Sequence, residues 1–360
     1  MRLSSPFRLI AVLGLAAAAA ACADSTGPLA LDADTLEADL AGANGAVSAP
    51  AVVSFAAAGD AIDAVLAGMG GGASVTDLPA TLLVNPKAVM DQVELRRSLR
   101  AETGQPAAIP AAALGGTFEY DVALGRYVKG TRTGAPANGV RFVLYAVDPA
   151  THEIVQPLVE TGHVDLTRTV TNQTAIARVE VYGGGANLVK VLDYSATVSG
   201  SVVSPQLLVA GFAKNGTDSL TFSLTSQLTL ATQTIAIDWR TALPSRGLAS
   251  RVQQTITGGA NPNVTIDGLL TSSSGRVGIA GTIEQQTGGT LTVRVNGGIF
   301  ATISVDSAED ETPTILNRDG EPLTEREAHL LEHILEWFEH AFDTYEDLMR
   351  PVRFLLDLAF

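Results

Sequence analysis

The stretch Ser219-Leu-Thr-Phe-Ser-Leu-Thr225 alternates apolar and polar side chains without a break. Leu220, Phe222 and Leu224 occupy every second position, and hydroxyl-bearing residues stand between them. Because successive side chains of a β-strand point to opposite faces of its sheet, this period of two predicts a strand with one apolar and one polar face. The fold is therefore expected to contain a sheet that buries only one of its sides.

The same pattern extends over the middle of the chain. It recurs at Val140, Phe142 and Leu144, at Ile235, Ile237 and Trp239, and at Leu291, Val293 and Val295. Turn signals such as Asn215-Gly216 and Asn296-Gly297 separate these segments and are typical of hairpins. We expect about ten to twelve antiparallel strands within residues 113–306. Joined as a meander, they would form a curved sheet or half-barrel, which makes the fold class mainly β (α+β).

A helix within residues 320–360 is predicted to cover the apolar side of this sheet. Thr324 and Glu327 form a capping box, which places the helix start near Glu325, and Pro351 marks its end. The apolar residues that follow at helical spacing are Leu331, Ile334, Leu335, Phe338, Ala341, Phe342, Tyr345 and Met349. The polar side of the helix is acidic, whereas a membrane-surface helix would carry lysine and arginine. We therefore expect it to pack on the sheet.

The N-terminus has the three parts of an export signal. Arg2 and Arg8 precede an apolar run from Leu9 to Ala21, which is shorter than the roughly 20 residues needed to span a bilayer. The segment Ala19-Ala-Ala-Cys22 resembles the lipobox of bacterial lipoproteins. That resemblance implies cleavage before Cys22 and a covalent lipid on its sulfur. The alternative is an ordinary signal peptide followed by an incidental cysteine.

The part of the chain that precedes the sheet divides into three segments. Residues 1–21 would be the signal peptide, and residues 22–50 a lipidated tether with one short helix around Thr35 to Leu40. Residues 51–112 would form a helical N-terminal region and linker, including a helix that begins at Pro86. By the sorting rule of enteric lipoproteins, Ala23 after the cysteine implies the outer membrane of a bacterial envelope.

The chain is acidic, with 23 basic against 38 acidic residues and a formal charge of −15. Such a charge repels nucleic acid and anionic headgroups, so we expect no nucleic-acid partner and expect the lipid to supply the membrane attachment. Cys22 is the only cysteine, which excludes an intramolecular disulfide and leaves stability to a buried core.

One short motif points to metal chemistry. His329-Leu-Leu-Glu-His333 resembles the H-x-x-E-H motif of the inverzincin peptidases, in which two histidines one turn apart hold zinc. Glu336 and His340 fall on the same side of the helix, so all four side chains are candidate metal ligands. The alternative is the solvated face of an amphipathic helix. His163, at an expected strand edge, has no acid at an informative spacing.

The sequence leaves two candidate functions, which belong to different classes of protein. The first is a non-catalytic, membrane-anchored envelope lipoprotein with a structural or protein-interaction role and no cofactor besides its lipid. In the second, the outline loosely resembles the lipoprotein and lipid carriers of the bacterial envelope, which implies an acyl chain or other hydrophobic ligand beneath the helix. The candidate ligand-binding residues are Phe338, Phe342, Tyr345, Trp239 and Phe222. The first is favoured because the helix carries enough apolar side chains to fill the concavity; a metal-binding protein or enzyme is third.

Overall fold

The computed structural model describes residues 31–69 and 109–349, apart from short gaps at 152, 172–173, 186, 202, 259–261, 285 and 307–312. Within these residues the chain forms one fifteen-stranded sheet and four α-helices. The signal peptide, Cys22 and the helix expected from Pro86 lie outside the described residues, so they stay predictions.

The strands follow one another closely in sequence. Their bounds are β1 (Thr117–Asp121), β2 (Arg126–Lys129), β3 (Gly139–Tyr145), β4 (Glu160–Thr171), β5 (Thr174–Gly183), β6 (Val189–Ser201), β7 (Ser204–Asn215), β8 (Asp218–Thr229), β9 (Thr234–Leu243), β10 (Leu248–Thr257), β11 (Asn263–Ser272), β12 (Gly275–Glu284), β13 (Gly288–Val295), β14 (Gly298–Val305) and β15 (Thr314–Asn317). A short 3₁₀ turn, η1 (Pro244–Arg246), joins β9 to β10.

The sheet is a long meander. From β3 to β15 every strand pairs antiparallel with the next one along the chain, and β1 lies between β2 and β3. The β1–β3 pair is parallel, which makes the sheet mixed. Since β2 and β15 are the two ends of the strand order, the described sheet is open. The predicted mainly-β fold is confirmed.

The strand number is larger than expected. Fourteen strands lie between Thr117 and Val305, and β15 falls beyond the predicted boundary at residue 306. The physical reason lies in the turns, because residues such as Gly216 (φ 61°) and Asn296 (φ 49°) adopt the left-handed conformation of tight hairpins. Tight hairpins leave almost no residues between consecutive strands.

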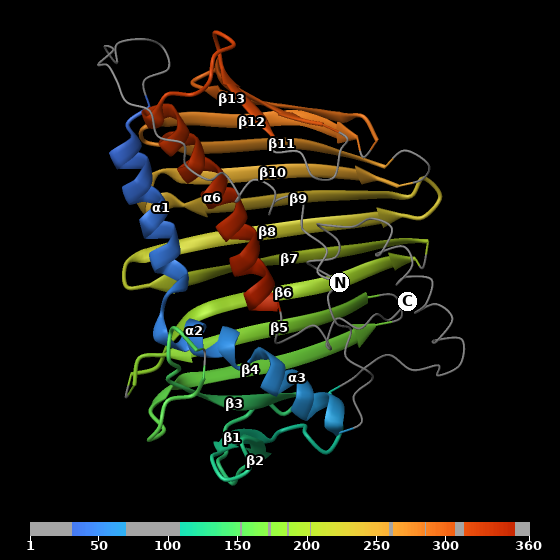
Figure 1. The fold of residues 1–360 in the computed structure, drawn as a ribbon. Coiled ribbons are helices and arrows are strands. Elements are labelled where there is room, and N and C mark those ends of the chain that lie inside the picture. The colour runs from blue at the N-terminus through green and yellow to red at the C-terminus, as the bar shows by residue number, and fades with distance from the viewer. Residues whose placement is uncertain are drawn as a thin grey trace.

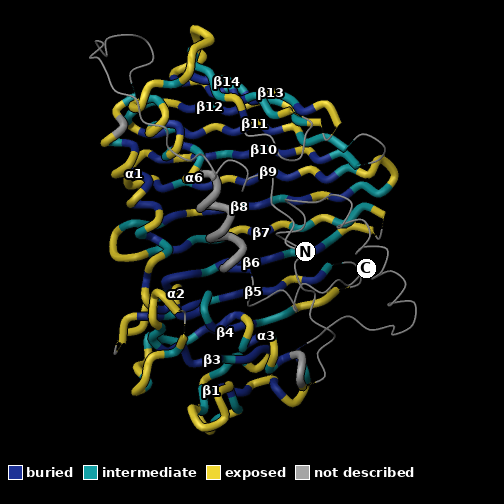
Figure 2. The backbone as a smooth tube through the Cα atoms, viewed as in Figure 1, coloured by how far each residue is buried: buried dark blue, intermediate teal, exposed yellow. Residues whose placement is uncertain are grey.

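The alternation seen in the sequence is realised along the strands. Leu220, Phe222 and Leu224 are buried while Thr221 is exposed, and Figure 2 shows buried and exposed residues alternating along the sheet. The register places Trp239 opposite Leu224. The apolar side chains of neighbouring strands therefore form continuous rows on one face, which we call the inner face.

All four helices lie on the inner face (Figure 1). They are α1 (Ala33–Val47), α2 (Pro50–Ala57), α3 (Gly59–Gly68) and α6 (Glu325–Met349). In Figure 1, α6 crosses the strands diagonally, and α1 lies near one set of strand ends. The opposite side of the sheet, the outer face, carries the polar half of the alternation.

Helix α1 differs from the short helix expected within a tether. It spans 15 residues, and the Asp32 side chain accepts a hydrogen bond from the Thr35 backbone N–H at its start. Leu36 and Leu40 are buried, and α1 contacts β7 and β8. Its apolar side chains are spaced to reach the inner face, so residues 33–47 pack with the sheet instead of forming a free linker.

Helix α6 begins at Glu325, as the capping box predicts. The Thr324 backbone N–H donates to Glu327 Oε2 at 2.8 Å, which is the geometry that this motif requires. Near the other end, the Tyr194 hydroxyl of β6 donates to the Leu348 carbonyl at 2.5 Å. These contacts, with buried Leu331 and Ile334, hold α6 on the inner face.

Among the described residues, no single helix is long and apolar enough to cross a membrane. The bent pair Asp34–Val47 and Pro50–Ala57, whose axes differ by 67°, passes that test jointly by length and composition.

Substituting Ile334→Ala should lower the free energy of unfolding by about 2–5 kcal/mol, because this fully buried side chain fills space between α6 and the sheet. Urea denaturation would measure the change. The matched control is Glu332→Ala on the exposed side of the same helix, which should change stability by less than about 0.5 kcal/mol. Equal effects of the two substitutions would show that α6 does not pack as described.

Candidate functional site

The histidines of α6 come together as a pair. The His329 and His333 rings lie edge to face with centroids 4.4 Å apart, and His333 Nδ1 lies 3.5 Å from Glu336 Oε2. The His340 side chain lies outside the described residues. In the part of the chain that the structure describes, no three His, Cys, Asp or Glu side chains form a group that could hold a metal ion. The four-residue metal site therefore stays a prediction, which depends on His340.

The ligand-binding candidates fall on both layers of the structure. Trp239 and Phe222 are buried on the inner face, where the Phe222 ring lies 6.1 Å from the Tyr194 ring between centroids. The side chains of Phe338, Phe342 and Tyr345 lie outside the described residues. The structure instead buries Trp337 on α6, a residue that the predicted apolar set omits. An indole has a large apolar surface and can join an apolar face although its N–H is polar. Trp337 follows Ile334 by three residues, and that helical spacing could have identified it.

Some polar atoms in this interior have no hydrogen-bond partner within the described structure. They are Gln254 Oε1 on β10 and Trp337 Nε1 on α6, whose residues are 3 % and 5 % exposed. The His333 Nε2 atom is also buried and has no hydrogen-bond partner in the part of the chain that the structure describes. Each unsatisfied buried polar group costs about 1–3 kcal/mol, so such atoms are candidates for contact with a ligand or with water.

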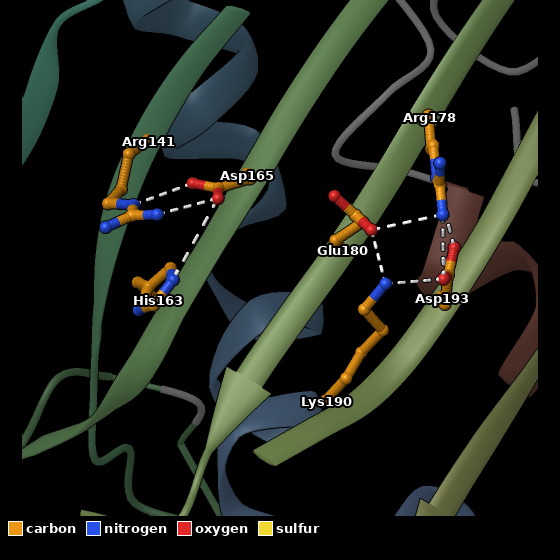
Figure 3. Close-up of polar contacts among 7 residues, drawn as sticks. All are labelled: Arg141, His163, Asp165, Arg178, Glu180, Lys190 and Asp193. Atoms are coloured by element: carbon orange, nitrogen blue, oxygen red, sulfur yellow. Dashed lines mark hydrogen bonds and ion pairs between the residues drawn. The ribbon is translucent and has the colours of Figure 1, made fainter. Parts of the chain in front are cut away.

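The outer face holds a second arrangement, which Figure 3 shows from the side opposite the helices. We call it the charged cluster; its members are Arg141, His163, Asp165, Arg178, Glu180, Lys190 and Asp193. The register aligns Arg141, Asp165, Glu180 and Asp193 in one row across β3, β4, β5 and β6. The residues come from four strands, so no local sequence motif indicates that they lie together.

Each carboxylate of the cluster is paired with a cation. Asp165 accepts two hydrogen bonds from Arg141, both at 2.7 Å. Asp193 Oδ2 lies 3.1 Å from Arg178 Nη2 and 2.8 Å from Lys190 Nζ. Lys190 also contacts Glu180. Burial alone would raise the pKa of Asp193, but hydrogen bonds from Arg178 and Lys190 bring it below its ordinary value.

His163 lies at one end of the cluster. Its ring stacks on Tyr182 with centroids 4.9 Å apart, and its Nε2 lies 4.0 Å from Asp165 Oδ2. Burial is the main cause that lowers the pKa of His163, and the Arg141 charge adds to it while Asp165 opposes it. The prediction that no acid accompanies this histidine was wrong, because residues two apart on a strand share a face.

The arrangement is suited to fixing strands rather than to proton transfer. Asp193 has a pKa below its ordinary value because Arg178 and Lys190 donate hydrogen bonds to it, whereas a general acid or base needs a pKa near the working pH. Comparison of the chain with protein-family models, with curated proteins and with solved structures finds no match.

Acidification should destabilise the protein partly through His163. Its folded-state pKa lies below the ordinary value of 6.5, so the unfolded chain binds the proton more readily and stability falls as pH drops below about 6.5. The variant His163→Gln should lose less stability than the unmodified protein between about pH 7 and pH 5. Thermal melting across this range measures the difference, and identical pH profiles would contradict it.

Proposed function

We propose that this protein is a non-catalytic lipoprotein of the bacterial envelope, anchored through Cys22, whose wide sheet serves as a structural or interaction scaffold. The observation that carries the proposal is the division of the sheet into two faces. The inner face is buried with Leu331, Ile334 and Trp337 of α6, whereas the outer face is solvent-exposed and mainly polar, with isolated apolar residues such as Leu208. A scaffold needs a stable core and an accessible surface, and this division supplies both.

The charges of the outer face support a non-catalytic role. The Asp238 carboxylate is bound by Arg240 and Arg251, and hydrogen bonds from Arg240 contribute most to lowering its pKa. Glu160 is paired in the same way with Arg132, whose hydrogen bond lowers its pKa. Carboxylates held in this way stabilise the sheet and are poorly suited to accept or donate protons during a reaction.

Attachment to the membrane would come from the covalent lipid. The lipobox resemblance at Ala19 to Cys22 and the small residue Ala23 support an outer-membrane location. The formal charge of −15 gives no electrostatic attraction to anionic headgroups. The lipid is therefore the part of the proposal that determines location.

Replacing Cys22→Ala should remove the lipid and shift the protein from the membrane fraction to the soluble fraction of a bacterial host. A lipid-linked N-terminal peptide, detected by mass spectrometry, should disappear with it. Ser25→Ala serves as the control, since it changes a neighbouring residue but leaves the thiol in place. A Cys22→Ala protein that remains in the membrane with an unchanged N-terminal mass would refute the lipid anchor.

A second candidate is the carrier of a hydrophobic ligand beneath α6. Gln254 Oε1 and Trp337 Nε1, which have no hydrogen-bond partner among the described residues, favour it, because a ligand with a polar end could satisfy such atoms. Metal binding or catalysis remains the third candidate, with His329 and His333 as its residues.

Native mass spectrometry on the chain from Ala23 to Phe360 separates the first two candidates. A bare chain is expected for the scaffold, and a co-purifying lipid mass for the carrier. The Trp337→Phe variant removes the indole N–H but keeps an aromatic ring. In a closed core it should change stability by less than about 2 kcal/mol, since the loss of one unsatisfied donor offsets part of the packing lost with the smaller ring. Loss of a bound lipid in that variant would instead favour the carrier.

A further inference from the structure

One row of the outer face carries no charged side chain across twelve consecutive strands, β4 to β15. The cross-strand register joins its members in the order Thr171, Thr174, Ser199, Gln206, Gln227, Ala236, Thr255, Thr265, Thr282, Thr290, Ser304 and Thr314. All of them except Ala236 carry a hydroxyl or a carboxamide. We call the last six, one on each strand from β10 to β15, the hydroxyl row.

The hydroxyl row faces solvent. Thr255, Thr265, Thr282 and Thr290 are exposed, while neighbours such as Ile256 are buried on the inner face. Adjacent strands lie about 4.8 Å apart, so the row repeats a hydroxyl at that interval. Thr265 Oγ1 and Thr282 Oγ1 are 3.0 Å apart and hydrogen-bonded to each other. A hydroxyl has one donor and two acceptor positions, so both retain capacity for a further partner.

Strand propensity explains the threonines but not the sorting of charge. Threonine is favoured in strands, and cross-strand threonine pairs stabilise a sheet. Solvent-exposed surfaces, however, usually mix charged residues among the polar ones. Here the charges occupy other rows of the same face: Arg178, Arg240, Arg251 and Arg294 share one row, and Asp238 and Asp267 share the row between it and the hydroxyl row.

We propose that the hydroxyl row binds a neutral, hydroxyl-rich polysaccharide that lies across the strands. The acidic chain repels anionic polymers, and a cationic polymer would be attracted to the carboxylates of other rows rather than to this uncharged one. Hydroxyl groups donate to and accept from sugar hydroxyls equally well. The partner must be a polymer, because each exchange of water for a protein hydrogen bond gains little. Only a repeating ligand can use many such positions together.

The adjacent row, which carries Asp238 on β9 and Asp267 on β11, extends the uncharged surface on β13 and β14 only. Thr292 and Thr302 stand next to each other on β13 and β14, two residues along the strand from Thr290 and Ser304. They add hydroxyls along the strand direction as well as across it. This binding surface goes beyond the scaffold role and does not depend on lipidation at Cys22, so the two proposals can fail separately.

Sedimentation of the full chain, purified in mild detergent, with particles of cellulose or chitin tests the proposal. We expect the unmodified protein to sediment with at least one of the two, and to do so equally in about 1 M salt, because screening does not weaken uncharged contacts. The double variant Thr265→Lys with Thr282→Lys should bind about tenfold more weakly or worse.

Two further variants keep the result interpretable. Thr265→Val with Thr282→Val retains the branched shape but removes both hydroxyls, and it should also bind about tenfold more weakly. Thr221→Lys with Ala249→Lys adds the same charge to exposed outer-face positions away from the row, and it should bind like the unmodified protein. Thermal melting confirms that each variant is folded.

Three outcomes would overturn the proposal. They are failure of the unmodified protein to bind either polysaccharide, unchanged binding by both hydroxyl-row variants, and loss of binding in high salt. The first would exclude a neutral glycan partner, the second would place binding elsewhere, and the third would show that it is electrostatic. None of them bears on the lipid at Cys22.

Discussion

Covering one apolar face of a very wide sheet is the constraint on which the rest of this structure depends. Strands β4 to β14 alternate in polarity, so they cannot be buried on both sides and cannot leave their apolar rows in water. Helices α1, α2, α3 and α6 lie on that face, although they come from opposite ends of the chain. The Tyr194–Leu348 hydrogen bond and the capping box at Thr324 fix where α6 sits and where it begins.

The four helices lie on the inner face and do not cover the outer one. On the outer face the strand register therefore decides which side chains are neighbours. Because every strand from β3 onward pairs with its neighbour in sequence, residues far apart along the chain fall into straight rows. One row gathers the arginines and another holds only uncharged polar groups and one alanine. The charged cluster at β3 to β6 arises in the same way, with each carboxylate paired to a cation. Ion pairs at such partly exposed positions contribute modestly to stability, so the apolar core carries most of it.

The interior is not uniformly apolar. Gln254 and Trp337 bring polar atoms into the layer between helix and sheet, where each unsatisfied atom opposes the gain from burial. A scaffold tolerates such a cost when the core is large, whereas a carrier uses the atoms to orient a ligand. Both proposed functions are compatible with this architecture, and they differ in how these few atoms are satisfied.

The sequence by itself determined the elements that local chemistry specifies. A period of two gave the strands and their buried sides at Leu220, Phe222 and Leu224, and the Thr324–Glu327 capping box gave the start of α6 to the residue. The length of α1 was underestimated, because alanine and glycine give a weak helical period and its burial depends on β7 and β8. The parallel β1–β3 pair had no local signal, because which strands pair depends on the whole chain.

The candidate sites show the same division between features that local spacing predicts and features that depend on the tertiary structure. His329 and His333 are neighbours because residues four apart share one side of a helix, so their proximity could be predicted from spacing. The pairing of Arg141 with Asp165, the burial of Trp337 and the hydroxyl row could not. Those features depend on strand register and on the angle at which α6 crosses the sheet. The sequence determined which side of each element would be apolar, and only the tertiary structure decided which residues of different elements meet.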